Sequence, residues 1–261
     1  HDEAAPGARE AMAAQQLDHD LVDRMMQFCS RRFGQEWFDN AIEAYVDFEG
    51  IDPDAPHIDQ SELQLAMPWA YHSVPWGRMG ESLAELFVRD QGRKLPPDSR
   101  ALVDAQMHAW LSFWRIDAVE RGVGLRLHDL LTQEERFVHE RMGSQQAEPG
   151  LVIFGRVVDF GAISFIAGMH PHVLSFVDAS PLVERVKRSC RVRTRPVPLK
   201  SLRDPELQGW MIGEWRRLVH ARLLPPTITN TDGDPWESTV DHLMFARTDR
   251  AEVIARLALL E

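Results

Sequence analysis

The apolar residues of this chain change their spacing at Ser112, and this change constrains the fold more than any other feature. Before Ser112 they recur every three or four residues, which predicts amphipathic helices. After it, residues 113–119 alternate between apolar and polar with the period of two typical of a half-buried strand. A chain that passes from one period to the other predicts an α+β protein with segregated elements.

Residues 17–111 predict a helical bundle. In its first helix one stripe carries Leu17, Leu21, Met25, Phe28 and Cys29. Asp18 and Asp20 suit the solvated start of that helix, because acidic side chains complement the positive end of the helix dipole. A further helix is expected over residues 61–73, with a kink or break at Pro68. The small and polar residues 1–16 predict a flexible leader.

Residues 112–175 predict a small antiparallel β unit. Five short apolar stretches are separated by Gly122, Gly143, Pro149 and Gly161. Their spacing is typical of a meander that closes into a small barrel or packs as a curled sheet. Residues 151–158 are almost continuously apolar and predict the central strand.

Residues 176–261 predict a C-terminal helical or mixed region that begins near Pro181. Its clearest helix is Pro205–Leu223, with Asp204 as the cap and Pro205 at the first helical position. Residues 230–235 predict a turn. The expected fold is therefore α+β, with an N-terminal helical bundle, a small central antiparallel β-barrel-like unit and a C-terminal helical or mixed part.

Composition and the lack of targeting patterns indicate the cellular compartment that we expect for this protein. The chain has 261 residues, a net charge of −11 and two cysteines, which do not make a disulfide framework. No apolar run approaches the roughly 20 residues that a membrane span needs. No signal-peptide pattern is present, so we expect a cytoplasmic protein without membrane contact. The chain begins with His1 and ends in an apolar segment, from which we expect a longer parent protein.

Residues 185–203 are the main charge anomaly, because this stretch has no Asp or Glu. Its cations are Arg185, Lys187, Arg188, Arg191, Arg193, Arg195, Lys200 and Arg203. Such segregation in an acidic chain suits a strip that binds anions, including nucleic-acid phosphates. The alternative is that these cations pair with acidic residues of the same chain or form a plain solvated face.

Other chemical signals in the sequence are weak. His170-Pro-His172 places two imidazoles on one side of an extended segment, but two ligands do not hold a metal ion, so a polar strand exit is the alternative and no metal site is predicted. Trp69, Trp76, Trp110 and Trp114 cluster around the passage from helices to strands. They predict burial at that seam, with a stacking platform for bases or peptides as the alternative.

Several stretches resemble one known family. They are Leu111-Ser-Phe-Trp, Gly122-Val-Gly-Leu-Arg-Leu-His-Asp-Leu-Leu-Thr-Gln-Glu-Glu, Phe137-Val-His-Glu, Gly150-Leu-Val-Ile-Phe-Gly-Arg-Val-Val and Asn230-Thr-Asp-Gly-Asp-Pro. Together they resemble bacterial SEC-C motif-containing proteins. Members of that family typically carry a zinc knuckle, like the tail of the preprotein translocase ATPase, where it serves as a docking element. Cys29 and Cys190 match none of the knuckle ligands, so the resemblance implies zinc only in a terminal knuckle outside this chain.

The sequence is consistent with three functions. The first is a non-catalytic cytoplasmic adaptor that binds a protein partner, as the missing catalytic motifs and the resemblance suggest. The second is a nucleic-acid- or ribosome-associated binder that uses the basic stretch 185–203. The third is an enzyme whose site assembles from distant residues, including His128, His139, His170 and His172 with acidic neighbours.

Overall fold

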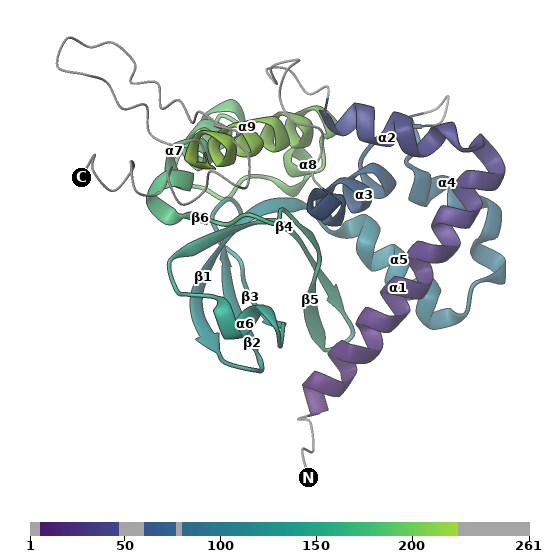
Figure 1. The fold of residues 1–261 in the computed structure, drawn as a ribbon, viewed down its shortest axis with the longest axis horizontal. Coiled ribbons are helices and arrows are strands. Elements are labelled where there is room, and N and C mark those ends of the chain that lie inside the picture. The colour runs from purple at the N-terminus through teal and green to yellow at the C-terminus, as the bar shows by residue number, and fades with distance from the viewer. Residues whose placement is uncertain (1–5, 47–59, 77–79, 224–261) are drawn as a thin grey trace, which may run out of the picture. The chain divides into compact units, whose positions relative to one another are not determined.

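The computed structural model of this protein describes residues 6–46, 60–76 and 80–223. Almost all of them belong to one compact unit, His1–Arg222. The N-terminal part is helical (Figure 1) and consists of α1 Pro6–Phe33, α2 Glu36–Val46, η1 Gln60–Glu62, α3 Leu63–His72, α4 Leu83–Gln91, η2 Gly92–Lys94 and α5 Pro97–His108. The predicted turn at residues 230–235 lies outside the described residues.

A five-stranded barrel follows the helices. Its strands are β1 Leu111–Glu120, β2 Gly124–Asp129, β3 Glu135–His139, β4 Leu151–Phe160 and β5 Ile163–Met169, and the short helix α6 Gly143–Gln146 lies between β3 and β4. The strand order is β1-β2-β3-β5-β4, and β4 also pairs with β1, which closes the sheet. The pairing of β3 with β5 is parallel and the other pairings around the barrel are antiparallel.

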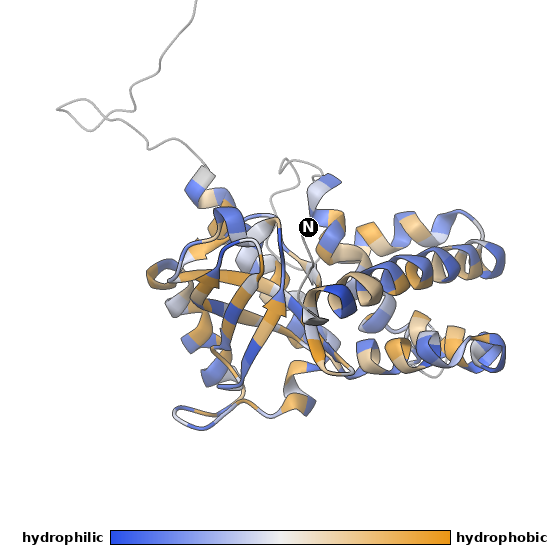
Figure 2. Cartoon of the chain, turned by 90° about the horizontal axis from the view of Figure 1, so that it is seen from below, coloured by the Kyte–Doolittle hydropathy of each residue, from blue (hydrophilic) through white to orange (hydrophobic). Residues whose placement is uncertain are grey.

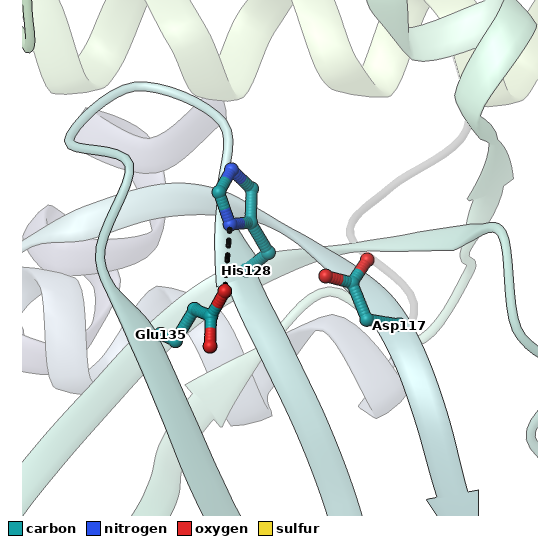
Figure 3. A group of neighbouring side chains, drawn as sticks. All are labelled: Asp117, His128 and Glu135. Carbon is teal, nitrogen blue, oxygen red and sulfur yellow. Dashed lines mark ion pairs between the residues drawn. The ribbon is translucent and has the colours of Figure 1, made fainter.

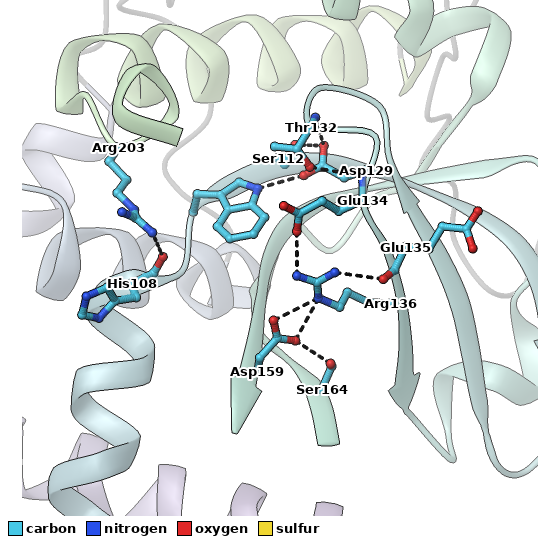
Figure 4. Close-up of polar contacts among 11 residues, drawn as sticks. His108, Ser112, Asp129, Thr132, Glu134, Glu135, Arg136, Asp159, Ser164 and Arg203 are labelled. Carbon is cyan, nitrogen blue, oxygen red and sulfur yellow. Dashed lines mark hydrogen bonds and ion pairs between the residues drawn. The ribbon is translucent and has the colours of Figure 1, made fainter. Parts of the chain in front are cut away.

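The parallel pair of β3 and β5 is supported by an ionic network (Figure 4). Arg136 on β3 contacts both carboxylate oxygens of Asp159 on β4 through Nε at 3.0 Å. The same guanidinium donates to Glu134 Oε2 at 2.6 Å, and Ser164 Oγ on β5 donates to Asp159 at 2.6 Å. Val138↔Ser164 is the register pair beside this network. Arg136 therefore connects β3 to β4 and, through Asp159, to β5, and its Nε and Nη2 groups donate in these contacts.

The C-terminal part covers one side of the barrel. It comprises the short strand β6 Leu174–Ser175, then α7 Phe176–Ser189, α8 Leu199–Leu202 and α9 Pro205–Leu223. Trp215 on α9 is fully buried and stacks on Phe113 and Phe154, at 5.7 and 5.2 Å between ring centroids. Figure 2 shows apolar and polar residues alternating along the barrel strands and in stripes on the helices.

A buried polar cluster connects the helices to the barrel. Arg156 on β4 is 2% exposed, and its Nη2 donates to the carbonyl of Gln106 on α5 at 2.6 Å. Gln106 Nε2 in turn donates to Asp18 Oδ1 on α1 at 2.5 Å. Burial raises the pKa of Asp18 to about 6, against the lowering effects of Gln106 and Arg156. Asp18 thus lies within α1 and is partly buried, and the interpretation as a solvated helix start is wrong.

The predicted fold class is confirmed, with local differences. Pro6–Gln16 form the first part of α1 instead of a flexible leader, because alanine strongly favours the helix and Ala11 and Ala14 are buried. Helix α3 continues through Pro68 without a break. Helix α7 begins at Phe176, before Pro181, because Ser175 Oγ accepts the backbone N–H of Asp178 as its cap.

The tryptophans predicted at the seam are largely buried there. Trp69 and Trp114 are at most 1% exposed and Trp110 is 8% exposed, so the rings of these three are not available as a stacking platform. Trp76 is half-buried, and its Nε1 donates to the carbonyl of Ala70 at 3.3 Å. Within the described residues, none of the helices has the length and apolar character needed to cross a membrane.

Candidate functional site

The basic stretch 185–203 runs from the last turns of α7 through a loop to the end of α8. Three of its eight cations are engaged within the protein. Arg185 pairs with Glu214 on α9 and stacks over Trp210 at 5.5 Å. Lys187 Nζ lies 3.4 Å from Glu184 Oε1. Arg203 donates to the carbonyl of His108 (Figure 4).

The other five cations remain exposed. They are Arg188, Arg191, Arg193, Arg195 and Lys200. Within the part of the chain that the structure describes, none of these five takes part in an ion pair. Arg188 only donates, through Nε, to the backbone carbonyl of Glu184 at 3.4 Å. The pairing expected under the intramolecular alternative is thus present for Arg185 and Lys187 but not for these five. We call the five residues the cationic loop surface.

Two buried valines hold this loop against the barrel. Val192 is 8% exposed and Val197 is 2% exposed, and the backbone N–H of Val197 donates to the carbonyl of Leu131 at 2.9 Å. Gln133 Nε2 donates to the carbonyl of Thr194 at 3.3 Å. Since the anchors turn inward, the residues 193–196 between them are left exposed. The loop is therefore a fixed element of the fold, and its arginines face solvent.

The barrel turn under the loop is shaped by a buried carboxylate (Figure 4). Asp129 is fully buried and accepts hydrogen bonds from Trp110 Nε1 at 2.8 Å and from Ser112 Oγ at 2.5 Å. It also accepts the backbone N–H groups of Leu131 and Thr132 at 2.8 and 3.2 Å. Because a buried carboxylate must be satisfied by donors, these contacts fix the turn on which Val197 rests.

Backbone strain is concentrated at the same junction. Among the described residues, the non-glycine residues with positive φ are Gln133 and Arg191, at 65° and 55°. Arg191 follows α7 in the position where helices often place glycine, since Val192 N–H bonds Lys187 O and Arg191 N–H bonds Arg188 O at 2.9 Å each. A left-handed conformation costs a non-glycine residue energy. Arg191 therefore has a backbone conformation that glycine adopts at a lower conformational energy.

A second group of polar residues lies on the outer face of the barrel (Figure 3). Asp117, His128 and Glu135 come from β1, β2 and β3, and their ligand atoms all lie within 4.8 Å of one another. His128 Nδ1 is 4.0 Å from Glu135 Oε1. Arg115 Nε, however, donates to Asp117 Oδ1 at 2.6 Å. That guanidinium already neutralises one carboxylate, so the group resembles a ladder of surface ion pairs more than a cation site.

His170 and His172, which the enzyme hypothesis names, lie in the connection between β5 and β6, whereas His128 is on β2. His170 is 2% exposed, and its Nε2 lies 3.6 Å from Glu62 Oε2. Glu62 also accepts Arg216 Nε at 2.8 Å. Burial acts to raise the pKa of Glu62, but His170 and Arg216 outweigh it and hold the pKa below its usual range. His172 contributes its backbone N–H to His170 Nδ1 at 3.2 Å. This cluster joins η1, the β5–β6 connection and α9.

The strand order and the single parallel pair define the class of the central domain. A five-stranded Greek-key barrel closed in this order has the connectivity of the OB-fold. The chain belongs to DUF7986, a family of unknown function whose model matches residues 19–190. Four of the five residues of the cationic loop surface come after residue 190 and lie outside the matched part of the chain. No curated protein and no solved structure matches the chain.

Proposed function

We propose that this protein binds nucleic acid through its cationic loop surface, with contacts to phosphates instead of base edges. The observation that carries the proposal is the set of five exposed arginine and lysine side chains without ion pairs among the described residues. They lie at the end of α7, on the anchored loop after it and in α8, in a chain whose net charge is −11. An acidic protein that concentrates free cations in one short segment presents a local binding surface for anions.

Phosphate neutralisation predicts a defined salt dependence. If all five cations contact phosphates of a single strand, the slope of log K against log salt is about −3.5, at roughly 0.7 per contact. The OB connectivity of the barrel does not itself support this surface, because such barrels bind oligonucleotides through the face of strands 2 and 3 and the loops beside it, and the cationic loop surface lies outside those strands.

The test uses labelled single-stranded RNA and DNA, titrated with the full chain at several salt concentrations. The variant Arg188→Glu/Arg191→Glu/Arg193→Glu reverses three cations of the surface. The matched control, Arg93→Glu/Arg126→Glu/Arg141→Glu, makes the same change of charge at exposed arginines elsewhere. We expect the first variant to abolish binding at moderate salt and the control to retain most of it.

Two results would overturn this proposal. One is wild-type protein that does not bind either oligonucleotide at low salt. The other is an equal loss of binding in both triple variants, which would mean that the net charge of the protein matters and the loop does not.

A protein-binding adaptor remains the second candidate, supported by an exposed apolar patch. Val173, Phe176 and Val177 are 38%, 41% and 78% exposed around the start of α7. Apolar patches of this kind often mark protein contacts. The cytoplasmic location, the resemblance to SEC-C motif-containing proteins and a terminal zinc knuckle stay predictions. Val177→Glu in a capture experiment with the full chain would test the adaptor, since loss of a specific partner is expected.

A further inference from the structure

A cavity of about 410 Å³ lies between α1 and the segment formed by α4 and η2. Elements α1 and α4 pack against each other (Figure 1). Arg24, Phe28 and Arg31 line the cavity from α1, and the spacing of four and then three residues places them on one helix face. Asp90, Gln91 and Lys94 line the opposite wall. The volume is within the range of small-molecule sites, roughly 300–1,000 Å³.

The cavity walls are strongly cationic. Arg24, Arg31 and Lys94 are exposed, and among the described residues none of them has an ion pair. Arg32 Nη1 instead pairs with Asp90 Oδ2 at 3.0 Å and ties the two walls together. The acidic residue of the cavity is therefore already neutralised, and three cations are left for an anionic ligand.

The cavity lining also contains aromatic and amide side chains. Phe28 is half-buried and packs edge-on against the buried Phe87, with ring centroids 5.5 Å apart and an interplanar angle of 68°. Gln27 and Gln91 add side-chain amides, one from each wall. An exposed part of an aromatic ring can stack on a planar base, and amides can both donate to and accept from the edge of a base.

We propose that this cavity binds a nucleoside phosphate. Arg24, Arg31 and Lys94 hold the phosphate groups, Phe28 supports the base, and Gln27 and Gln91 contact its polar edge. The site shares no residue with the cationic loop surface, so it is a separate binding function. A simple phosphate would satisfy the cations alone and leave the aromatic and amide groups unused.

The test uses the full chain and the fluorescent probe N-methylanthraniloyl-ADP, followed by anisotropy. Competitors are ADP, adenosine and pyrophosphate, which separate the whole ligand from its parts. Arg31→Glu and Lys94→Glu remove cations of the cavity. Arg93→Glu is the matched control, because Arg93 is an exposed neighbour of Lys94 that does not line the cavity. Phe28→Leu removes the ring and keeps an apolar side chain.

We expect saturable binding that ADP displaces at concentrations about tenfold lower than either pyrophosphate or adenosine. Arg31→Glu, Lys94→Glu and Phe28→Leu should each weaken binding about tenfold, and Arg93→Glu less than about twofold. Far-ultraviolet circular dichroism and thermal midpoints confirm that the variants remain folded.

The proposal is overturned if the probe does not saturate, if pyrophosphate competes as well as ADP, or if Arg93→Glu weakens binding as much as Lys94→Glu. The triple variant of the cationic loop surface distinguishes this site from the proposed nucleic-acid function. It should retain probe binding within about twofold, whatever its effect on oligonucleotides.

Discussion

The substitution Arg191→Gly should change the stability of the protein and its oligonucleotide binding in opposite directions. Arg191 has a φ of 55° and occupies the residue position after α7 at which helices often end with glycine. Its side chain is exposed and has no ion pair within the described residues, so the substitution removes one cation without leaving a buried partner. We expect a protein that is more stable and binds oligonucleotides less tightly.

The magnitude follows from two opposing backbone effects. The left-handed conformation costs a non-glycine residue about 1–2 kcal/mol. Glycine loses about 0.5–1 kcal/mol more conformational entropy on folding. The net gain in the free energy of unfolding is therefore between about 0 and 1.5 kcal/mol. For a protein of this size that corresponds to a rise in the thermal midpoint of up to about 6 °C.

Two assays and one control variant test this reasoning. Urea denaturation measures the free energy of unfolding, and a salt titration of oligonucleotide binding measures the number of phosphate contacts. Arg191→Ala removes the same charge but keeps a Cβ in the left-handed conformation, so it should not gain stability. In both variants the slope of log K against log salt should become shallower by about 0.7.

Backbone strain at Arg191 is disproved if Arg191→Gly is less stable than the wild type, or if Arg191→Ala is stabilised as much as Arg191→Gly. The first result would mean that the arginine side chain makes a stabilising contact in solution. The second would mean that removal of the charge, and not relief of the backbone, stabilises the protein. Unchanged salt slopes would separately show that Arg191 contacts no phosphate.

Two further predictions concern the contacts between helices and barrel. Burial raises the pKa of Asp18 from 3.8 to about 6, so the stability that protonated Asp18 contributes should be lost between about pH 4 and pH 6, a decrease of about 3 kcal/mol; Asp18→Asn should remove this decrease, and urea midpoints between pH 4 and 7 that change in parallel in both proteins would contradict it. Gly168→Ala should destabilise the protein by about 1–3 kcal/mol, because a Cβ would lie 2.8 Å from the carbonyl oxygen of Gln64 and 2.9 Å from Pro68 Cγ. Gly161→Ala is its control in thermal denaturation, since that glycine also has positive φ but nothing lies within 4 Å of the added Cβ; equal losses would show that the backbone conformation alone is responsible.

Elements with local signals were predictable from the sequence. Helix α9 has the predicted bounds Pro205–Leu223, because the capping residue Asp204 and the proline after it act on adjacent backbone. The barrel strands follow from the alternation of apolar residues. The early start of α1 has a local signal in its alanines, which favour the helix, but the burial of Ala11 and Ala14 against distant parts of the chain has none.

The candidate sites also combine features that are visible in the sequence with features that depend on distant contacts. The charges of residues 185–203 are visible in the sequence, but Glu214, which neutralises Arg185, lies on another helix. The cavity between α1 and α4 combines residues far apart along the chain, and the arginines of α1 alone resemble an ordinary solvated helix face. Asp18 was misinterpreted for the same reason, since its partner Gln106 is on α5.

Capping, periodicity and charge depend on neighbouring residues, so the order of amino acids indicates most helices and strands and where the positive charge is concentrated. Long-range packing sets the parallel pairing of β3 with β5, which arginines are paired and which face solvent, and which cations surround the cavity. These features depend on which segments pack together. Packing brings together residues that are far apart along the chain, and the residues next to each of them do not indicate the partner.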